Sequence, residues 1–226
     1  SFPAIGLWLL GAAVAGGADL LKVKVTPGRD VEPVAAVRRC AGAVPVAADA
    51  NGSYPDPSAA SDIDALGLAY LEQPFAPGAP WDELAASQAG LRTPVALDES
   101  LTSPDAVRSA VLAGALDVVS VKPARLGGIE AAAAVVRLAE QSSVPCFVGG
   151  MLELGIGRAG SAAVAALSGC SLPTDLGPSD AYVAQDICEP IGLDGIGQLR
   201  VPPGTGSGRT PDPTRLSEVT VDEVVL

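Results

Sequence analysis

Charged side chains recur along this sequence, each at the end of an apolar, β-branched stretch. Successive members of the set lie between 23 and 26 residues apart, about the length of one strand, one helix and their loops. They are Lys24, Asp49, Glu72, Asp98 and Lys122. If the strands are parallel neighbours, these five side chains meet at one edge of the sheet.

Three carboxylates on adjacent strands would repel one another unless a cation lay among them. The chain contains no histidine, and oxygen ligands without histidine or cysteine favour a hard ion such as Mg²⁺, with Mn²⁺ as an alternative. Lysines beside a bound cation have a lowered pKa, as a lysine base requires. Each acidic residue alone is equally consistent with a helix cap, so the argument depends on the whole set.

Composition narrows the class of protein. The chain has 226 residues, is 48% hydrophobic and carries a formal net charge of −12, which argues against nucleic acid as a partner. Four scattered cysteines predict buried thiols in a reduced, cytoplasmic protein. An apolar run at residues 2–18 is broken by glycine and proline and has no basic residue before it, so we predict no membrane insertion.

Strand-like and helix-like stretches alternate along the chain, which predicts parallel βαβ units. Seven strands are expected from Lys22 onward, the last of them SLPTDLG at 171–177, and FPAIGLW at 2–8 is a candidate for an earlier strand. Eight strands predict a closed TIM-like barrel, with its active site at the carboxyl ends of the strands. A doubly wound open sheet is the alternative, but no glycine-rich turn follows the first strand.

Two short stretches test this arrangement. In LKVKV, residues 21–25, strand alternation places Lys22 and Lys24 on one face, and we expect that face to point into the barrel. The stretch GIGRAG, residues 155–160, matches a dinucleotide fingerprint only weakly because it follows a late strand. We expect it to be a helix N-terminus that faces the site.

At these residues the chain resembles the muconate-lactonizing-type branch of the enolase superfamily. The similar segments are the KxK of Lys22 and Lys24, DAN at 49–51, EQP at 72–74, DES at 98–100 and KP at 122–123. The stretch GGMLELGIGR, 149–158, is similar to the o-succinylbenzoate synthase and N-acylamino acid racemase group.

The resemblance implies a (β/α)7β barrel at residues 1–190, with a short first βα unit. It implies a tail at 191–226 that would pack on an N-terminal capping domain, which we expect to be missing from this chain. It implies that Asp49, Glu72 and Asp98 bind Mg²⁺ and that Lys24 and Lys122 flank the substrate. Substrate contacts or supporting positions are then expected at Lys22, Asn51, Glu99, Gly150, Met151 and Glu153.

The implied reaction is removal of a proton α to a carboxylate through an enediolate. The leading prediction is dehydration to o-succinylbenzoate in menaquinone synthesis, on a small carboxylate substrate. The alternatives are racemisation of N-acylamino acids, then dipeptide epimerisation, for which Asp175 and Asp180 are candidates, and muconate cycloisomerisation. An inactive barrel fragment is the non-enzymatic alternative, since without a cap we expect Mg²⁺ binding but poor turnover. A homo-oligomer is left open.

Overall fold

The computed structural model of the chain describes residues 16–181, 183–195 and 197–221. Six parallel strands form one sheet whose order in space follows the order in sequence. The strands are β1 Leu21–Lys24, β2 Val46–Asp49, β3 Leu71–Glu72, β4 Val95–Leu97, β5 Val118–Val121 and β6 Cys146–Val148. The predicted parallel βα architecture is therefore confirmed for this part of the chain.

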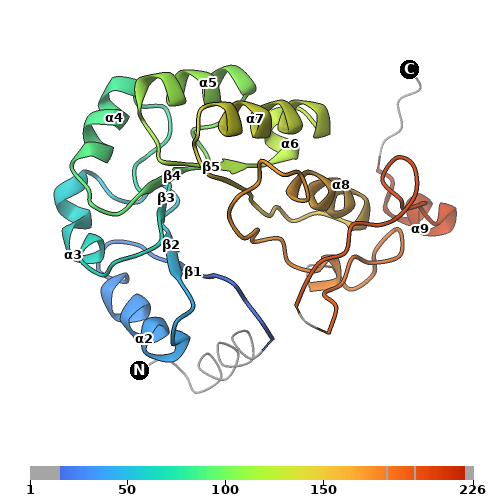
Figure 1. Cartoon of the computed structure of the whole chain (residues 1–226). Helices are drawn as coiled ribbons and strands as arrows, with labels where there is room; N and C mark the ends of the chain where they lie inside the picture. The colour runs from blue at the N-terminus through green and yellow to red at the C-terminus, as the bar shows by residue number, and fades with distance from the viewer. Residues whose placement is uncertain (1–15, 182, 196, 222–226) are drawn as a thin grey trace.

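Helices connect the strands and lie along the outer side of the curved sheet (Figure 1). Ser103 shows why a helix begins where it does: its hydroxyl accepts from the amide of Ala106, and Pro104 occupies the first turn. The helical segments are α2 Val31–Ala41, η1 Pro57–Ala60, α3 Ser61–Asp64, α4 Trp81–Ala89, α5 Pro104–Ala113, α6 Pro123–Leu126, α7 Ile129–Gln141, α8 Gly155–Ala165, η2 Ser179–Ala181 and α9 Pro213–Val219.

The two faces of the sheet have different partners. Residues such as Ala48, Leu71 and Val119 belong to the large apolar core that the helices cover. The opposite face carries a small second cluster, made of Ala47, Tyr70, Ala96, Val118 and Phe147. Because side chains alternate along a strand, the residues two positions further on along β2, β3 and β4 extend this inner face toward the carboxyl ends. Those residues are Asp49, Glu72 and Asp98.

The register confirms that the charged residues lie side by side. Lys24 pairs with Asp49, and Asp49 pairs with Glu72, across β1, β2 and β3. Lys22 pairs with Ala47, so it lies on the inner face with Lys24, as the alternation in LKVKV predicts. Strand spacing in the sequence thus becomes a row of charges at one edge of the sheet.

The predicted seventh strand is wrong within the described residues. Residues 171–177 are extended and follow β6, but only the amides of Ser171 and Leu172 bond to the strand, both at the Cys146 carbonyl. Pro173 has no amide hydrogen to continue the ladder. The hydroxyl of Thr174 instead donates to the Val148 carbonyl at 2.6 Å, so a side chain replaces the backbone bond.

The described sheet is consequently open, with β1 and β6 at its edges, rather than the closed barrel that the sequence predicts. The candidate strand at 2–8 lies outside the described residues. A cavity of about 450 Å³ is lined by residues 17–20 before β1, by the end of α8, by residues 173–177 and by Leu193, Gly197, Gln198, Leu199 and Val201.

The segment after residue 190 is only partly packed. Ile191 is buried and exchanges hydrogen bonds with Ser179, whereas α9, which the sequence analysis did not predict, buries none of its residues. The Asp212 amide and the Arg215 side chain bond to the carbonyls of Ile187 and Asp186. The boundary at 190/191 and the packing of this tail on a capping domain remain predictions.

Two composition-based predictions can be compared with the structure. No helix in the described ranges combines the length and the apolarity that a bilayer crossing requires. The four cysteines are free, and Cys146 and Cys188 are buried, but Cys40 is exposed on α2, so the prediction of four buried thiols is wrong for that residue.

Candidate active site

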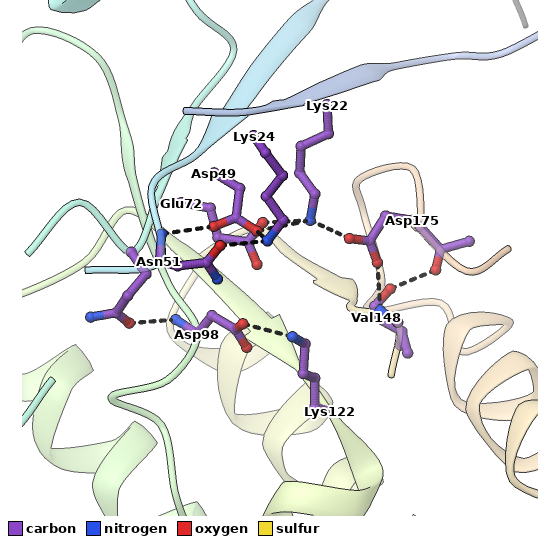
Figure 2. A network of polar contacts seen from close by, with 12 residues as sticks. Lys22, Lys24, Asp49, Asn51, Glu72, Asp98, Lys122, Val148 and Asp175 are labelled. Carbon is purple, nitrogen blue, oxygen red and sulfur yellow. Dashed lines mark hydrogen bonds and ion pairs between the residues drawn. The ribbon is translucent and has the colours of Figure 1, made fainter. Parts of the chain in front are cut away.

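Lys24 and Asp49 form the first ion pair at the carboxyl edge of the sheet (Figure 2). The Lys24 ammonium lies 2.5 Å from Asp49 Oδ2 and donates to Asn51 Oδ1 at 2.7 Å. Asn51 has a left-handed backbone, with φ of 44°, and its backbone N–H donates to Asp49 Oδ1. This uncommon conformation turns the chain back after β2 and brings the amide side chain to the lysine.

Lys22 forms the second group, with carboxylates from two distant parts of the chain. Its ammonium lies 2.6 Å from Glu72 Oε2 and 4.0 Å from Asp49 Oδ2, and it also pairs with Asp175. Burial alone would lower the pKa of Lys22, but the Glu72 and Asp175 carboxylates outweigh it and hold that pKa above its ordinary value. These ion pairs favour the charged form of Lys22, which makes it a poor candidate for a base.

Glu72 is the most deeply buried carboxylate of the site, with no exposed side-chain surface. Burial, together with the charge of Asp49, raises the pKa of Glu72 to about 7 even though Lys22 opposes the shift. Its Oε1 atom is buried and has no hydrogen-bond partner among the described residues. One oxygen of Glu72 is thus available for a further positive partner.

Asp98 is held between two cations. Its Oδ2 atom lies 2.6 Å from the Lys122 ammonium, and its Oδ1 atom pairs with the Arg125 guanidinium from α6. Gln73 positions this carboxylate from behind, since its Oε1 accepts from the amides of Asp98 and Ser100. Gln73 is fully buried with φ of 37°, so the fold maintains a strained backbone to place this amide group.

Lys24 and Lys122 reach the carboxylates from different strands, β1 and the end of β5, and approach them from opposite sides in Figure 2. Lys122 is largely buried, with 12% of its side chain exposed, whereas Lys24 is 67% exposed. Two lysines thus flank one acidic group, which is the arrangement that proton transfer at either face of a substrate requires.

The carboxylates are a fitting set of donors for Mg²⁺ or Mn²⁺. Asp49, Glu72 and Asp98 offer only oxygen atoms, and Glu72 Oε1 has no partner. The Lys22 ammonium between Glu72 and Asp49 marks a position that accommodates positive charge. As placed here, however, no three acidic or cysteine side chains of the described residues are grouped to hold one ion, because each carboxylate is paired with an ammonium group.

The remaining predicted site residues fall into two groups. Glu99 accepts from Asn51 Nδ2 at 2.8 Å, and the Gly150 amide donates to Asp175 at 2.6 Å, so both connect to the charged network. The Met151 carbonyl and the Glu153 carboxylate instead contact Arg158, a fully buried arginine on α8. The described contacts therefore tie Met151 and Glu153 to α8 rather than to the carboxylates.

Two residues of the network, Arg125 and Gln73, were absent from the predicted site, and Asp175 was named only as a candidate for dipeptide epimerisation. Asp175 lies in the extended segment 171–177 after β6, so the rule that found Asp49 and Glu72 could have included it in the main site. Arg125 lies one helical turn after Lys122, which is a weaker signal. Gln73 is the middle residue of the EQP segment, but that segment does not indicate its role, which depends on its left-handed backbone.

The N-terminus of α8 is already occupied by a carboxylate of the chain. The Gly155 amide donates to Asp186 Oδ2 at 2.7 Å, and a Cβ atom at Gly155 would lie 2.7 Å from the Cys188 sulfur. GIGRAG does begin helix α8, as predicted, but Asp186 takes up its first amide, so its role toward an anion in the site remains a prediction.

Gly149 has no side chain, and the Lys122 side chain occupies the space where a Cβ atom at position 149 would lie. A Cβ atom added there would lie 2.7 Å from Lys122 Cε and 2.8 Å from Ser120 Oγ. We expect Gly149→Ala to displace the Lys122 ammonium. If the site removes a substrate α proton, as the resemblance implies, exchange of that proton with solvent should fall about a hundredfold, since misplacements of about 1 Å have such effects. NMR in deuterated buffer measures this exchange.

The matched control for Gly149→Ala is Gly192→Ala, where an added Cβ meets nothing within 4 Å. The control variant should exchange at the rate of the parent chain. Circular dichroism should show the same fold for both variants, because Lys122 Cε is the flexible end of its side chain. Full exchange in a folded Gly149→Ala variant would show that the position of Lys122 does not matter.

Comparison with known proteins places these observations in a family. Residues 9–215 match the family described as enolase C-terminal domain-like, so the chain belongs to that family. It is 39% identical to an N-succinylamino acid racemase of Amycolatopsis, over 96% of this chain and 59% of the relative. It is 37% identical to an o-succinylbenzoate synthase of Geobacillus kaustophilus, over 92% of this chain and 56% of the relative.

A solved structure supports the same family assignment. A probable mandelate racemase from Alicyclobacillus acidocaldarius superposes with a TM-score of 0.87 and 38% identity, over 98% of this chain and 59% of the other. The chain thus spans somewhat more than half the length of these relatives and corresponds to the barrel part of the family fold. The family resemblance predicted from the KxK, DAN, EQP, DES and KP segments is confirmed.

Proposed function

We propose that this chain carries the catalytic machinery of a Mg²⁺-dependent enzyme that removes a proton α to a carboxylate. The observation that carries the proposal is the pair of lysines: Lys24 and Lys122 are anchored on two different carboxylates, Asp49 and Asp98, on either side of the buried Glu72. A lysine base working with a metal that stabilises an enediolate is the mechanism known for enolase-superfamily sites.

Each of these side chains has a distinct role in the proposed reaction. Asp49, Glu72 and Asp98 would hold Mg²⁺, which would stabilise the negative charge gained by the substrate carboxylate when the proton leaves. Lys24 Nζ accepts the α proton. Lys122, held beside Asp98, either stabilises the intermediate as a cation or returns a proton to the opposite face. Lys22 stabilises the ionised form of Glu72 and so opposes the effect of burial on its pKa.

The leading reaction is dehydration to o-succinylbenzoate, supported by relatives of that name at up to 39% identity. Racemisation of an N-succinylamino acid is the second candidate, supported by relatives at 39% and 40% identity and by the presence of two lysines. Both groups of relatives are named for substrates or products with a succinyl group, so we propose a substrate with that group. Dipeptide epimerisation is less well supported, because Asp175 is already bound to Lys22 and Gly150.

Two assays of the chain distinguish the candidates. One follows o-succinylbenzoate formation by absorbance, and the other follows α-deuterium uptake by N-succinylvaline in D₂O by NMR. We expect activity with Mg²⁺ in at least one assay and its loss with EDTA, since the proton is too weakly acidic without the ion. Deuterium uptake with inversion indicates racemisation, whereas formation of o-succinylbenzoate alone indicates dehydration. Equal rates with Mg²⁺ and EDTA would contradict the proposal.

A further inference from the structure

A cavity of about 370 Å³ opens beside Lys24, at the carboxyl ends of β1 and β2. Sites for small molecules generally begin at about this size. Lys24 contributes to the wall of the cavity and also pairs with Asp49, so the cavity adjoins the proposed proton-transfer site. A substrate held at the carboxylates could therefore extend part of its structure into this space.

The charged side chains that line this cavity are both cationic. Lys24 is engaged by Asp49 and Asn51, but the exposed Arg29 side chain makes no hydrogen bond or ion pair with any other described residue. Its neighbour Asp30 does not neutralise it, because the buried Asp30 carboxylate accepts from Tyr54 Oη at 2.7 Å and from the Val31 amide. A free guanidinium is well suited to bind a carboxylate through two parallel hydrogen bonds.

The turn that carries Arg29 is well defined. Thr26 and Arg29 exchange both backbone hydrogen bonds, and Gly28 between them has φ of 78°, a left-handed conformation that favours glycine. The side chain thus extends from a short closed turn directly after β1. This arrangement limits the entropy lost when Arg29 binds a ligand.

A second polar group in the wall also lacks a partner. The hydroxyl of Ser53 is buried and makes no hydrogen bond among the described residues. The loop holds it firmly, since the amides of Gly52 and Tyr54 donate to the carbonyls of Gln73 and Pro74 at 2.7 and 3.0 Å. Leaving a buried hydroxyl unbonded is costly, and a ligand oxygen would remove that cost.

We propose that this cavity binds the second carboxylate of the substrate, at the far end of its succinyl group. Arg29 pairs with that carboxylate, and the Ser53 hydroxyl donates a hydrogen bond to it. This assignment rests on the proposed function for the identity of the substrate, but the binding it claims is independent of turnover. It makes the β1–α2 turn a determinant of specificity for dicarboxylates over monocarboxylates.

Calorimetric titration with Mg²⁺ present tests the assignment, using N-succinylvaline and N-acetylvaline as a matched pair of ligands. The parent chain should bind the succinyl compound more tightly. We expect Arg29→Met to weaken that binding about 10- to 100-fold, which is the usual contribution of a hydrogen bond to a charged group. The affinity for N-acetylvaline should change by no more than about twofold. Ser53→Ala should reduce the affinity for the succinyl compound about three- to tenfold and leave the affinity for N-acetylvaline unchanged.

The control is Arg39→Met, which removes an exposed arginine from the last turn of α2. It should bind both ligands as the parent chain does. The proposal is overturned if the parent chain does not prefer the succinyl compound, or if Arg29→Met affects both ligands equally or neither. Deuterium uptake, measured separately, tests the proposed function: selective binding without exchange would refute only that function, and exchange without selectivity would refute only this subsite.

Discussion

Replacing Lys24 with alanine should slow α-proton removal by at least about 10²–10⁴-fold, the usual contribution of a positioned general base. The reason lies in the geometry, because Lys24 is the exposed lysine at the end of β1, anchored to Asp49 and Asn51 and bordering the cavity described above. Lys22, two residues earlier, is less suited to this role, because the Glu72 and Asp175 carboxylates raise its pKa. Deuterium uptake by N-succinylvaline in D₂O measures the effect on racemisation. Formation of o-succinylbenzoate measures it on dehydration, because that product keeps no α hydrogen.

The same experiment on Lys122→Ala separates the two candidate reactions. Dehydration needs one base, so Lys122→Ala should leave measurable o-succinylbenzoate formation, whereas racemisation should lose deuterium exchange from one enantiomer entirely. Arg39→Ala, an exposed change in α2, serves as the control and should leave the rate unchanged. Persistent exchange in the double variant Lys24→Ala, Lys122→Ala would rule the two-lysine mechanism out.

Glu72→Gln should reduce the affinity for Mg²⁺ by at least about a hundredfold, because even residues that only support metal ligands usually contribute 10- to 100-fold. The amide offers one neutral oxygen in place of a buried carboxylate, and Lys22 would lose one of its two closest ionic partners. Calorimetric titration with Mg²⁺, or electron paramagnetic resonance with Mn²⁺, gives the affinity directly and requires no substrate.

Asp64→Asn is the matched control for Glu72→Gln, since Asp64 is also a buried carboxylate. It accepts from the backbone amides of Arg92 and Thr93, and its hydrogen bonds to other described side chains do not involve the site residues. Its removal should lower the unfolding temperature without changing the affinity for Mg²⁺. An unchanged affinity in a folded Glu72→Gln variant would show that Glu72 is not a ligand.

The sequence determined the elements and their direction because local patterns specify them. β-branched runs, caps such as Ser103 and the spacing between charged residues predicted the parallel βα units, and all six strands of the described sheet were among those expected. Closure of the sheet was not predictable in the same way. The segment 171–177 resembles a strand by composition, but whether it joins the sheet depends on its backbone hydrogen bonds with β6. Pro173 has no amide hydrogen and Thr174 bonds through its side chain, so the backbone pairing with β6 ends at these residues.

By itself, the sequence also determined which residues gather at the site. Alternation along each strand and a spacing of about one βα unit place Lys24, Asp49, Glu72, Asp98 and Lys122 on one face and at one edge. Only the tertiary structure decided which charge pairs with which. Lys22 meets Asp175 across 153 residues and Glu72 across 50, and Arg125 reaches Asp98 from α6. Such pairings depend on the curvature of the sheet and on loop conformations, which no local pattern encodes.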